Sequence, residues 1–178
     1  MQWQRKTSAI FLTKMPVSDQ GVTKDRYMLI PRTAIFVRRG DEYLLLKGAP
    51  TKRLWAGKYN GLGGHVDRGE DVLSSARREL MEEAGISADL WLAGTVIVDT
   101  GEIGILLFVL VGENAQGEVK ASKEGTPEWI QIEALSHLPV VEDLPIFLRQ
   151  IHSMKRGDPP FFARSFYENE KLNVIFGE

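Results

Sequence analysis

Three glutamates stand close together near the middle of the chain. Glu79, Glu82 and Glu83 are spaced so that the second and third lie three and four residues after the first. On an α-helix these carboxylates fall within a sector of roughly 100°, with neighbouring Cβ atoms about 5–6 Å apart. Mg²⁺ prefers oxygen ligands and takes a few carboxylates while keeping several waters. The spacing therefore indicates a site for a divalent cation.

A solvated acidic helix face is the alternative reading of this cluster. Glu79 and Glu83, however, form a like-charge pair one helical turn apart, which costs a few tenths of a kcal/mol when no cation is bound. Only Arg78, four residues before Glu82, offers local compensation. An apolar stripe beside the acids would pack the helix down, so we expect the core and the chemistry to use different faces. The stripe consists of Leu73, Ala76, Leu80 and Ala84.

The segment from Gly64 to Ile86 resembles the Nudix box, G-x5-E-x7-R-E-U-x-E-E-x-G-U, where U is an aliphatic residue. Every defined position matches, which makes the motif highly specific. The matching residues are Gly64, Glu70, Arg78, Glu79, Leu80, Glu82, Glu83, Gly85 and Ile86. The resemblance implies the Nudix fold, an α/β/α sandwich around a mixed β-sheet. It also implies divalent-metal-dependent hydrolysis of a nucleoside diphosphate linked to a further moiety. Outside the box the likeness is looser and extends over residues 30–176.

The resemblance also implies roles for the box residues. Glu79, Glu82 and Glu83 are carried over as ligands of Mg²⁺, with Mn²⁺ as a substitute, and the Gly64 carbonyl is a further candidate ligand. One of Glu82 or Glu83 would orient or deprotonate the attacking water through the metal shell. Arg78 is expected to clamp a carboxylate, against the alternative of an exposed ion pair.

Residues beside these ligands have more open roles. Glu70 stabilises the helix N-terminus or pairs with Arg78, unless it binds the metal directly. Gly63 and Gly64 let the backbone approach the phosphate or metal, or else form only a bulge. His65 fits no box position and is a bystander or a phosphate contact.

A further acid from a distant loop is expected to complete the site. Glu124 and Glu128 are the candidates, and Glu124 is preferred as auxiliary ligand or general base. Its neighbour Gly125 gives the loop freedom to bring the carboxylate over the helix. A solvated loop glutamate is the alternative.

Substrate selection depends on residues outside the box. The segment from Trp55 to Gly64 is similar to that of the oxidised-purine nucleoside triphosphate diphosphatases, where Arg-Trp-Asn replaces Lys58-Tyr59-Asn60. Asn60 would offer amide donors and an acceptor to a purine edge. Glu142-Asp143 resembles the acidic pair that reads the base in that subfamily. We assign Lys58, Asn60, Gly63, Glu142 and Asp143 to substrate binding.

The chain departs from that subfamily in one respect. Those enzymes commonly place a tryptophan just before the acidic pair, where it stacks on the base, but this chain has Val140-Val141. Trp55, Tyr59 and Phe36 are the candidates for the missing stacking partner, against the alternative that these aromatic residues belong to the core.

Composition agrees with a single enzyme domain. With 178 residues the chain can bury one substantial core. Its 22 Lys+Arg against 24 Asp+Glu, a formal charge of −2, provide no basic surface for a long nucleic acid, so a small nucleotide is the expected partner. The chain has no cysteine, and its early apolar run, residues 9–12, is too short to span a membrane. We expect a cytoplasmic protein without a membrane partner, and the oligomeric state stays open.

Periodicity and turn residues predict the elements. Residues 1–27 are an N-terminal extension or an additional strand, and residues 28–178 form the Nudix hydrolase domain. Strands are expected at residues 28–38, 43–47, 60–66, 90–99, 103–111, 128–132, 161–167 and 172–176. The glutamate helix should run from about residue 71 to Gly85, and a second helix from about residue 141 or 144 to 154.

These patterns together predict an activity. The expected reaction is hydrolysis of a nucleoside triphosphate to the monophosphate and pyrophosphate, with oxidised purine nucleotides as leading substrates. Hydrolysis of ADP-ribose or another nucleoside diphosphate conjugate is the alternative. A regulator that binds a nucleotide without cleaving it is a third reading, although such proteins often lose box carboxylates that this chain keeps.

Overall fold

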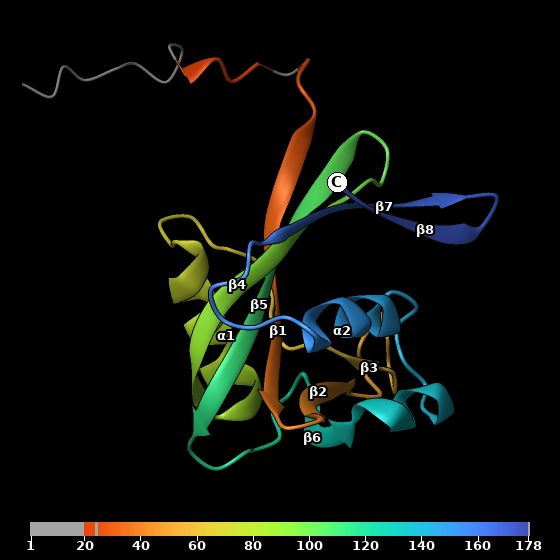
Figure 1. The fold of residues 1–178 in the computed structure, drawn as a ribbon. Helices are drawn as coiled ribbons and strands as arrows, with labels where there is room; N and C mark the ends of the chain where they lie inside the picture. Colours follow the sequence, from red (N-terminus) through yellow and green to blue (C-terminus); the bar gives the residue numbers. More distant parts are fainter. Residues whose placement is uncertain (1–19, 24, 178) are drawn as a thin grey trace, which may run out of the picture.

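A mixed β-sheet forms the centre of the molecule (Figure 1). The computed structural model describes residues 20–23 and 25–177, and in this part of the chain eight strands form one sheet. The strands are β1 (Met28–Arg39), β2 (Glu42–Gly48), β3 (Tyr59–Asn60), β4 (Ser87–Val98), β5 (Ile103–Gln116), β6 (Gly125–Gln131), β7 (Phe161–Glu168) and β8 (Lys171–Phe176). The helices are α1 (Val72–Ala84), α2 (Leu144–His152) and the 3₁₀ helix Ile132–His137.

The strand order is β3-β2-β1-β5-β4-β7-β8, and β6 pairs with β2. β1 runs parallel to β5, and β4 runs parallel to β7, whereas the other pairs are antiparallel. The parallel pair places β1 inside the sheet, where its later residues, Ile35 to Val37, are covered on both faces. The central strand therefore connects the two sides of the molecule.

The two helices cover opposite faces of this sheet. Ile35 and Val37 of β1 pack in the cluster that contains Leu80 of α1, whereas Phe36 packs in the cluster that contains Phe147 of α2. This division follows from the alternation of side chains along a strand. The predicted α/β/α sandwich around a mixed sheet is confirmed, with α1 and α2 on the two sides (Figure 1).

Local signals determine where α1 begins and ends. The Asp71 side chain accepts hydrogen bonds from the N–H groups of Leu73 and Ser74, and so caps the first turn. Gly85 adopts φ 70° and donates its N–H to the Met81 carbonyl, which ends the helix.

The apolar stripe of α1 is only partly as expected. Ala76, Leu80 and Ala84 are buried, but Leu73 is 38% exposed, so its assignment to the stripe was wrong. Val72 packs against the core instead. The reason is its position one full turn before Ala76, whereas Leu73 lies at the margin of the face.

Most predicted strands and both helices are present, with shifted ends. The short strand expected at residues 60–66 is an exception, because only Tyr59 and Asn60 form β3. Beyond them the chain makes two isolated bridges to β1, Leu62 with Ile35 and His65 with Arg32. The glycines between them interrupt regular pairing while keeping this segment against β1.

Residues 1–19 of the predicted N-terminal extension lie outside the described residues, and the division at residue 28 stays a prediction.

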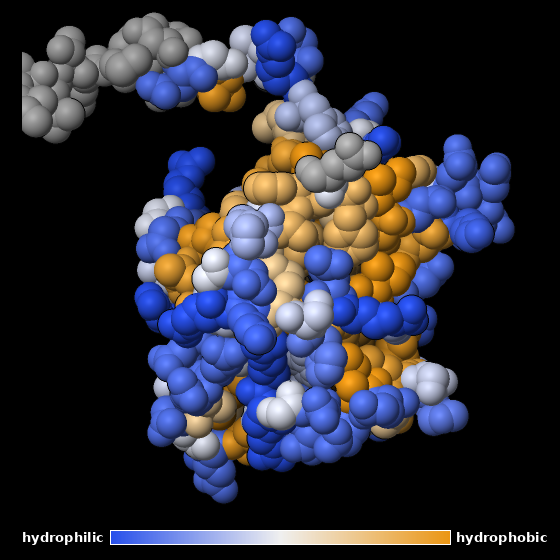
Figure 2. All heavy atoms as spheres, viewed as in Figure 1, coloured by the Kyte–Doolittle hydropathy of each residue, from blue (hydrophilic) through white to orange (hydrophobic). Residues whose placement is uncertain are grey.

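Figure 2 shows apolar residues gathered over the upper part of the sheet. There the register partners Met28 and Ile103 are 52% and 49% exposed. In residues 20–23 and 25–177 no helix is both long enough and apolar enough to cross a membrane.

Candidate active site

An acidic pocket of about 410 Å³ lies where α1 meets the glycine-rich segment after β3. Three glutamates of α1 line it together with a fourth from the loop before β6. These are Glu79, Glu82, Glu83 and Glu124. Gly63, Gly64 and His65 supply backbone on the other side. The structure therefore brings the helical acids and the preferred distant acid into one cavity. The other candidate, Glu128, accepts a hydrogen bond from the Tyr59 hydroxyl at 2.7 Å and does not line this pocket.

Glu83 is the most buried of these acids. It is 5% exposed, and its Oε2 accepts a hydrogen bond from the Gly63 N–H at 2.7 Å. Burial raises the pKa of Glu83 to about 7, with the charge of Glu79 acting in the same direction and the Gly63 N–H opposing it. The expectation that core and chemistry use different faces of α1 was therefore wrong, because Glu83 points inward beside Ala76 and Leu80.

Arg78 binds three carboxylates at once. Its Nε and Nη2 donate to the two oxygens of Glu70 at 2.8 and 3.0 Å, while Nη1 donates to Glu79 at 2.8 Å and to Glu82 at 3.2 Å. Glu70 reaches this position because it precedes the cap Asp71 and so lies outside the helix. The geometry thus pairs Glu70 with Arg78, and the guanidinium fixes where Glu79 and Glu82 lie.

The glycines permit close approach at the floor of the pocket. Gly63 has φ 123°, and a Cβ there would overlap the Thr33 carbonyl. A Cβ at Gly64 would instead overlap the Glu79 carboxylate. The Gly64 carbonyl accepts the Thr33 N–H at 2.8 Å, which leaves its second lone pair for a ligand. Gly63 therefore serves the backbone path, and Gly64 makes room for an acid.

The donor set of this pocket suits a hard cation, since it consists of carboxylate and carbonyl oxygens. In the described part of the chain, no group of three His, Cys, Asp or Glu side chains is already arranged to hold a metal ion. Instead, Arg78 holds Glu79 and Glu82, and Lys52 pairs with Glu124 at 3.1 Å. Glu79, Glu82, Glu83 and the Gly64 carbonyl are the groups that would hold a divalent ion.

A second, aromatic pocket of about 150 Å³ adjoins the acidic pocket on the α2 side of the sheet. Its aromatic walls are Phe36, Trp55 and Phe147, and its polar residues include Asn60 and Asp143. The Asn60 Oδ1 accepts the Gly61 N–H at 2.8 Å, which orients the amide. Burial raises the pKa of Asp143, with Glu142 acting in the same direction. Asn60 and Asp143 are thus among the hydrogen-bonding side chains at a small cavity with aromatic walls.

The structure separates the predicted substrate residues. Asn60, Gly63 and Asp143 line the aromatic pocket, but Glu142 does not and accepts a hydrogen bond from Tyr167 at 2.9 Å. Of the two acids, only Asp143, the N-cap residue of α2, therefore lies at this pocket, and the proposal that they read the base stays a prediction. Lys58 lines a narrow cavity with Asn60, Gly63 and Glu83.

The candidates for a stacking partner also separate. Tyr59 is buried in the core cluster, 4% exposed, and does not line the aromatic pocket. Trp55 is 43% exposed and has φ 59°, an uncommon conformation for a large side chain. Phe36 lines the pocket from β1 and is almost fully buried. Trp55 is therefore the aromatic residue with the most surface free for a ligand.

Sequence reasoning missed Arg32 and Phe147. Arg32 lines both pockets. Burial lowers the pKa of its guanidinium, and the negative charges of Glu79 and Glu83 oppose this by favouring the charged form. A cation within the largely apolar strand of residues 28–38 was the available signal. Nothing in the sequence marked Phe147 as a pocket residue, because a phenylalanine in an amphipathic helix usually occupies a core position.

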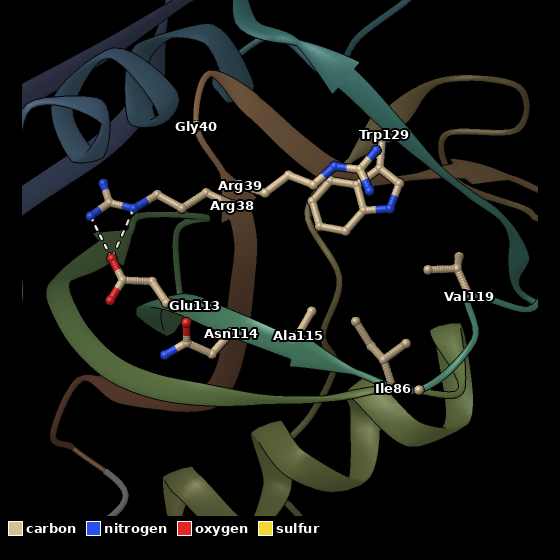
Figure 3. Close-up of a pocket in the computed structure, with 10 residues that line it drawn as sticks. Arg38, Arg39, Gly40, Ile86, Glu113, Asn114, Ala115, Val119 and Trp129 are labelled. Carbon is tan, nitrogen blue, oxygen red and sulfur yellow. Dashed lines mark hydrogen bonds and ion pairs between the residues drawn. The ribbon is translucent and has the colours of Figure 1, made fainter.

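A third cavity, of about 590 Å³, lies at the C-terminal ends of β1 and β5 (Figure 3). Its charged groups are already paired. Arg38 donates to Glu113 at 2.7 Å, and Arg39 binds Glu42 at 2.7 Å while its guanidinium lies 4.0 Å from the centre of the Trp129 ring. This cavity offers a ligand no unpaired charge, in contrast to the two pockets around Gly63.

Solved structures share this fold. A MutT protein from Bacillus halodurans superposes with a TM-score of 0.69 at 25% identity, covering 83% of this chain and 97% of that one. The NUDIX domain of Shewanella oneidensis NrtR, solved with ADP ribose, has a TM-score of 0.59 at 12% identity. It covers 78% of this chain and 97% of its own, and at that identity shows the fold alone.

Sequence relatives point the same way. An oxidized purine nucleoside triphosphate hydrolase from Danio rerio is 35% identical over 51% of this chain and 60% of its own length. An NAD-capped RNA hydrolase NudC from Stutzerimonas stutzeri is 30% identical over 74% of this chain, and the match spans only 47% of that protein. The NUDIX domain profile matches residues 28–151, which is well over half of the sequence. The chain therefore belongs to the NUDIX domain family.

Proposed function

We propose that this protein hydrolyses nucleoside triphosphates to the monophosphate and pyrophosphate, with oxidised purine nucleotides as leading substrates. The observation that carries the proposal is the contact between the two pockets. The acidic pocket and the aromatic pocket share Arg32 and Gly63 as lining residues. A nucleotide with its base against Trp55 and Asn60 would thus place its phosphates beside the glutamates of α1.

The chemistry requires neutralisation of phosphate charge and alignment of a water. Nudix enzymes generally use divalent metal ions, typically Mg²⁺. Such an ion, held here by Glu79, Glu82, Glu83 and the Gly64 carbonyl, would neutralise the phosphate oxygens and acidify a water. Mn²⁺ is a proposed substitute. Arg78 would keep two of these carboxylates in place, and Glu124 and Glu83 are the candidates to accept the proton from the water.

Small nucleotides are the substrates on which Nudix hydrolases act. The names of two relatives favour a purine triphosphate for this chain. Besides the zebrafish protein, an oxidized purine nucleoside triphosphate hydrolase from Mus musculus is 31% identical over 58% of this chain and 67% of its own length. Asn60 and Asp143 supply the donors and acceptors that discrimination among purine edges would need.

A nucleoside diphosphate conjugate such as ADP-ribose is the second candidate. The NAD-capped RNA hydrolase relatives favour it, since NAD is itself such a conjugate and their match covers about three quarters of this chain. The third reading, a regulator that binds without cleaving, is less well supported, because all the box carboxylates are present. Glu79, Glu82 and Glu83 line one pocket with Arg78, and Glu70 pairs with Arg78.

A substrate panel distinguishes these functions. The purified protein is incubated with Mg²⁺ and with standard and oxidised nucleoside triphosphates or diphosphate conjugates, and release of pyrophosphate and phosphate is measured. We expect pyrophosphate from a purine triphosphate at the highest kcat/KM. Preferred cleavage of ADP-ribose would replace the first candidate with the second, and metal-dependent binding without any turnover would favour the regulator.

A further inference from the structure

Arg32 occupies the boundary between the two pockets. Its side chain lines the aromatic pocket together with Asn60 and Asp143, and it also lines the acidic pocket together with Glu79 and Glu83. β1 fixes this position, because Arg32 pairs through its backbone with His65 of the glycine-rich segment. A molecule that extends from one pocket into the other would lie beside Arg32 and Gly63, which line both.

The guanidinium is incompletely satisfied within the protein. Its Nε is buried and has no hydrogen-bond partner in the described part of the chain. A buried donor without an acceptor destabilises a fold, and a guanidinium is rarely left so when carboxylates are near. The negative charges of Glu79 and Glu83 stabilise the charged guanidinium, yet neither carboxylate forms an ion pair with it within 4.0 Å.

Two of the other cations of the acidic pocket, Arg78 and Lys52, are already engaged, and a further one, Lys123, is exposed on the loop before β6. Arg78 donates to the carboxylates of Glu70, Glu79 and Glu82. Lys52 binds Glu124 at 3.1 Å. Arg32 therefore differs from both, since it has a donor available and lies on the side that faces the aromatic pocket. An anion is the chemistry that would satisfy it.

We propose that Arg32 binds the non-bridging oxygens of the phosphoanhydride where the substrate passes from the aromatic pocket to the acidic pocket. This role rests on the proposed function and deepens it by naming the phosphate contact that positions the scissile bond. The planar guanidinium matches a phosphate through two parallel N–H donors. It would align the phosphates with the carboxylates that hold the metal, and its half-buried side chain, with an unpaired Nε in the free protein, prepares it for that contact.

The test measures binding of a substrate analogue that cannot be cleaved. The α,β-methylene analogue of GTP is titrated in the presence of Mg²⁺ into the wild type, Arg32→Gln, Arg32→Lys and a control, Arg149→Gln. Arg149 is an exposed arginine of α2. We expect Arg32→Gln to weaken binding by roughly ten-fold to a hundred-fold, because a charge-assisted contact is lost. Arg32→Lys should recover part of the affinity, and Arg149→Gln should bind like the wild type.

Thermal unfolding distinguishes phosphate binding from a structural role. If Arg32 awaits a ligand, Arg32→Gln without ligand should unfold at the same temperature as the wild type or higher, since a half-buried charge with an unsatisfied Nε donor is removed. A melting temperature lowered by several degrees, with an affinity loss that Arg32→Lys does not reduce, would assign Arg32 to the fold and overturn the proposal.

The result also separates this inference from the proposed function. A wild type that cleaves triphosphates, with an Arg32→Gln variant that binds the analogue equally well, would reject the role of Arg32 and keep the function. A wild type that cleaves only ADP-ribose, with Arg32→Gln weakening ADP-ribose binding by ten-fold or more, would reject the triphosphate function and keep the phosphate contact. Should Arg32→Gln leave the KM for ADP-ribose unchanged, both would fail.

Discussion

The acidic pocket and the aromatic pocket are built in different ways, although they share Arg32 and Gly63. The α1 acids and the glycines come from one continuous segment, Gly64 to Ile86, with Gly63 just before it. The aromatic pocket draws its walls from β1, β3, β4, β5, α2, the loop before β3 and the glycine-rich segment after it. The first pocket is mostly charged, and the second is mostly apolar with a few hydrogen-bonding side chains.

This difference assigns the two requirements of hydrolysis to two parts of the chain. Carboxylates at helical spacing come together whenever the helix forms, so the metal chemistry depends on local structure. Recognition of a base needs walls that meet only when distant segments pack. Loop and strand changes can therefore alter the substrate without disturbing the acids of α1.

The largest effect is expected at the buried acid. Glu83→Gln keeps the size of the side chain and its helix propensity but removes a negative charge from the proposed metal ligands. Turnover at saturating Mg²⁺ should therefore fall by about two orders of magnitude or more. Glu82→Gln should lower turnover by the same mechanism. Steady-state kinetics with Glu102→Gln, an exposed glutamate, as the control measures this. Near-wild-type turnover in both variants would reject the metal assignment.

The next effect separates the two adjacent glycines. Gly64→Ala would push the Glu79 carboxylate aside, so activity should fall by roughly ten-fold or more while the protein still folds, and Gly64→Val should abolish activity. Gly63→Ala should instead lower the melting temperature, because φ 123° and the Thr33 carbonyl leave no room.

Circular dichroism melts and kcat values for these variants provide the comparison. Gly177→Ala is a matched control, since a Cβ there meets its nearest atom only at 3.5 Å. A fully active Gly64→Val protein would reduce this glycine to a spacer.

A smaller effect is expected in the aromatic pocket. Asn60→Ala and Asp143→Ala should raise KM and flatten the ranking among nucleotides, with losses of about 1–3 kcal/mol from unpaired base contacts. The affinity for Mg²⁺ should stay unchanged. Glu142→Ala should leave the ranking intact, because Glu142 binds Tyr167 outside the pocket.

Measured kcat/KM values across the substrate panel decide this prediction. Equal loss of kcat on every substrate in Asn60→Ala and Asp143→Ala would place these residues in the catalytic machinery or the fold. The contrast between the two pockets would then be lost.

The smallest effect concerns the stability of the metal-free protein. Because burial raises the pKa of Glu83 to about 7, from an ordinary value near 4.5, the folded state binds a proton that the unfolded state releases. Stability is therefore greatest below about pH 4.5 as far as this group is concerned, and falls as pH rises toward 7. We expect a decrease of a few degrees in melting temperature over this window.

Thermal melts at several pH values, with a chelator or with Mg²⁺, test this dependence. Glu83→Gln should remove it, and Mg²⁺ should restore stability at pH 7.5 because an ion replaces the proton. An identical pH profile in the wild type and Glu83→Gln would show that Glu83 titrates normally.

Much of the fold followed from local patterns. The hairpin of β1 and β2, the helix between the cap Asp71 and Gly85, and the last strand pair follow from turn residues and periodicity. The exposure of Leu73 and the burial of Glu83 did not follow. The rotation of α1 on the sheet decides both, and many side chains on the sheet determine that rotation together.

The candidate site divides in the same way. The sequence alone predicted the helical acids and Glu124, and the structure brings them into one pocket, while their catalytic roles stay predictions. Glu142 and Asp143 were expected to form an acidic pair at the base, but only Asp143 lines the aromatic pocket, whereas Glu142 accepts a hydrogen bond from Tyr167 of β7. Trp55 and Phe36 could not be distinguished from Tyr59, because an aromatic residue gives no sign of the cavity it faces.

The sequence by itself determined the family, the position of the glutamate helix and the oxygen donors for a cation, because a contiguous motif carries its geometry in its spacing. Only the tertiary structure decided where the second pocket lies and which residues join it to the first. Arg32 shows the reason. Its neighbours in space come from segments far apart in the chain, and only the packing of β1 against the glycine-rich segment brings its charge between the aromatic pocket and the acidic pocket.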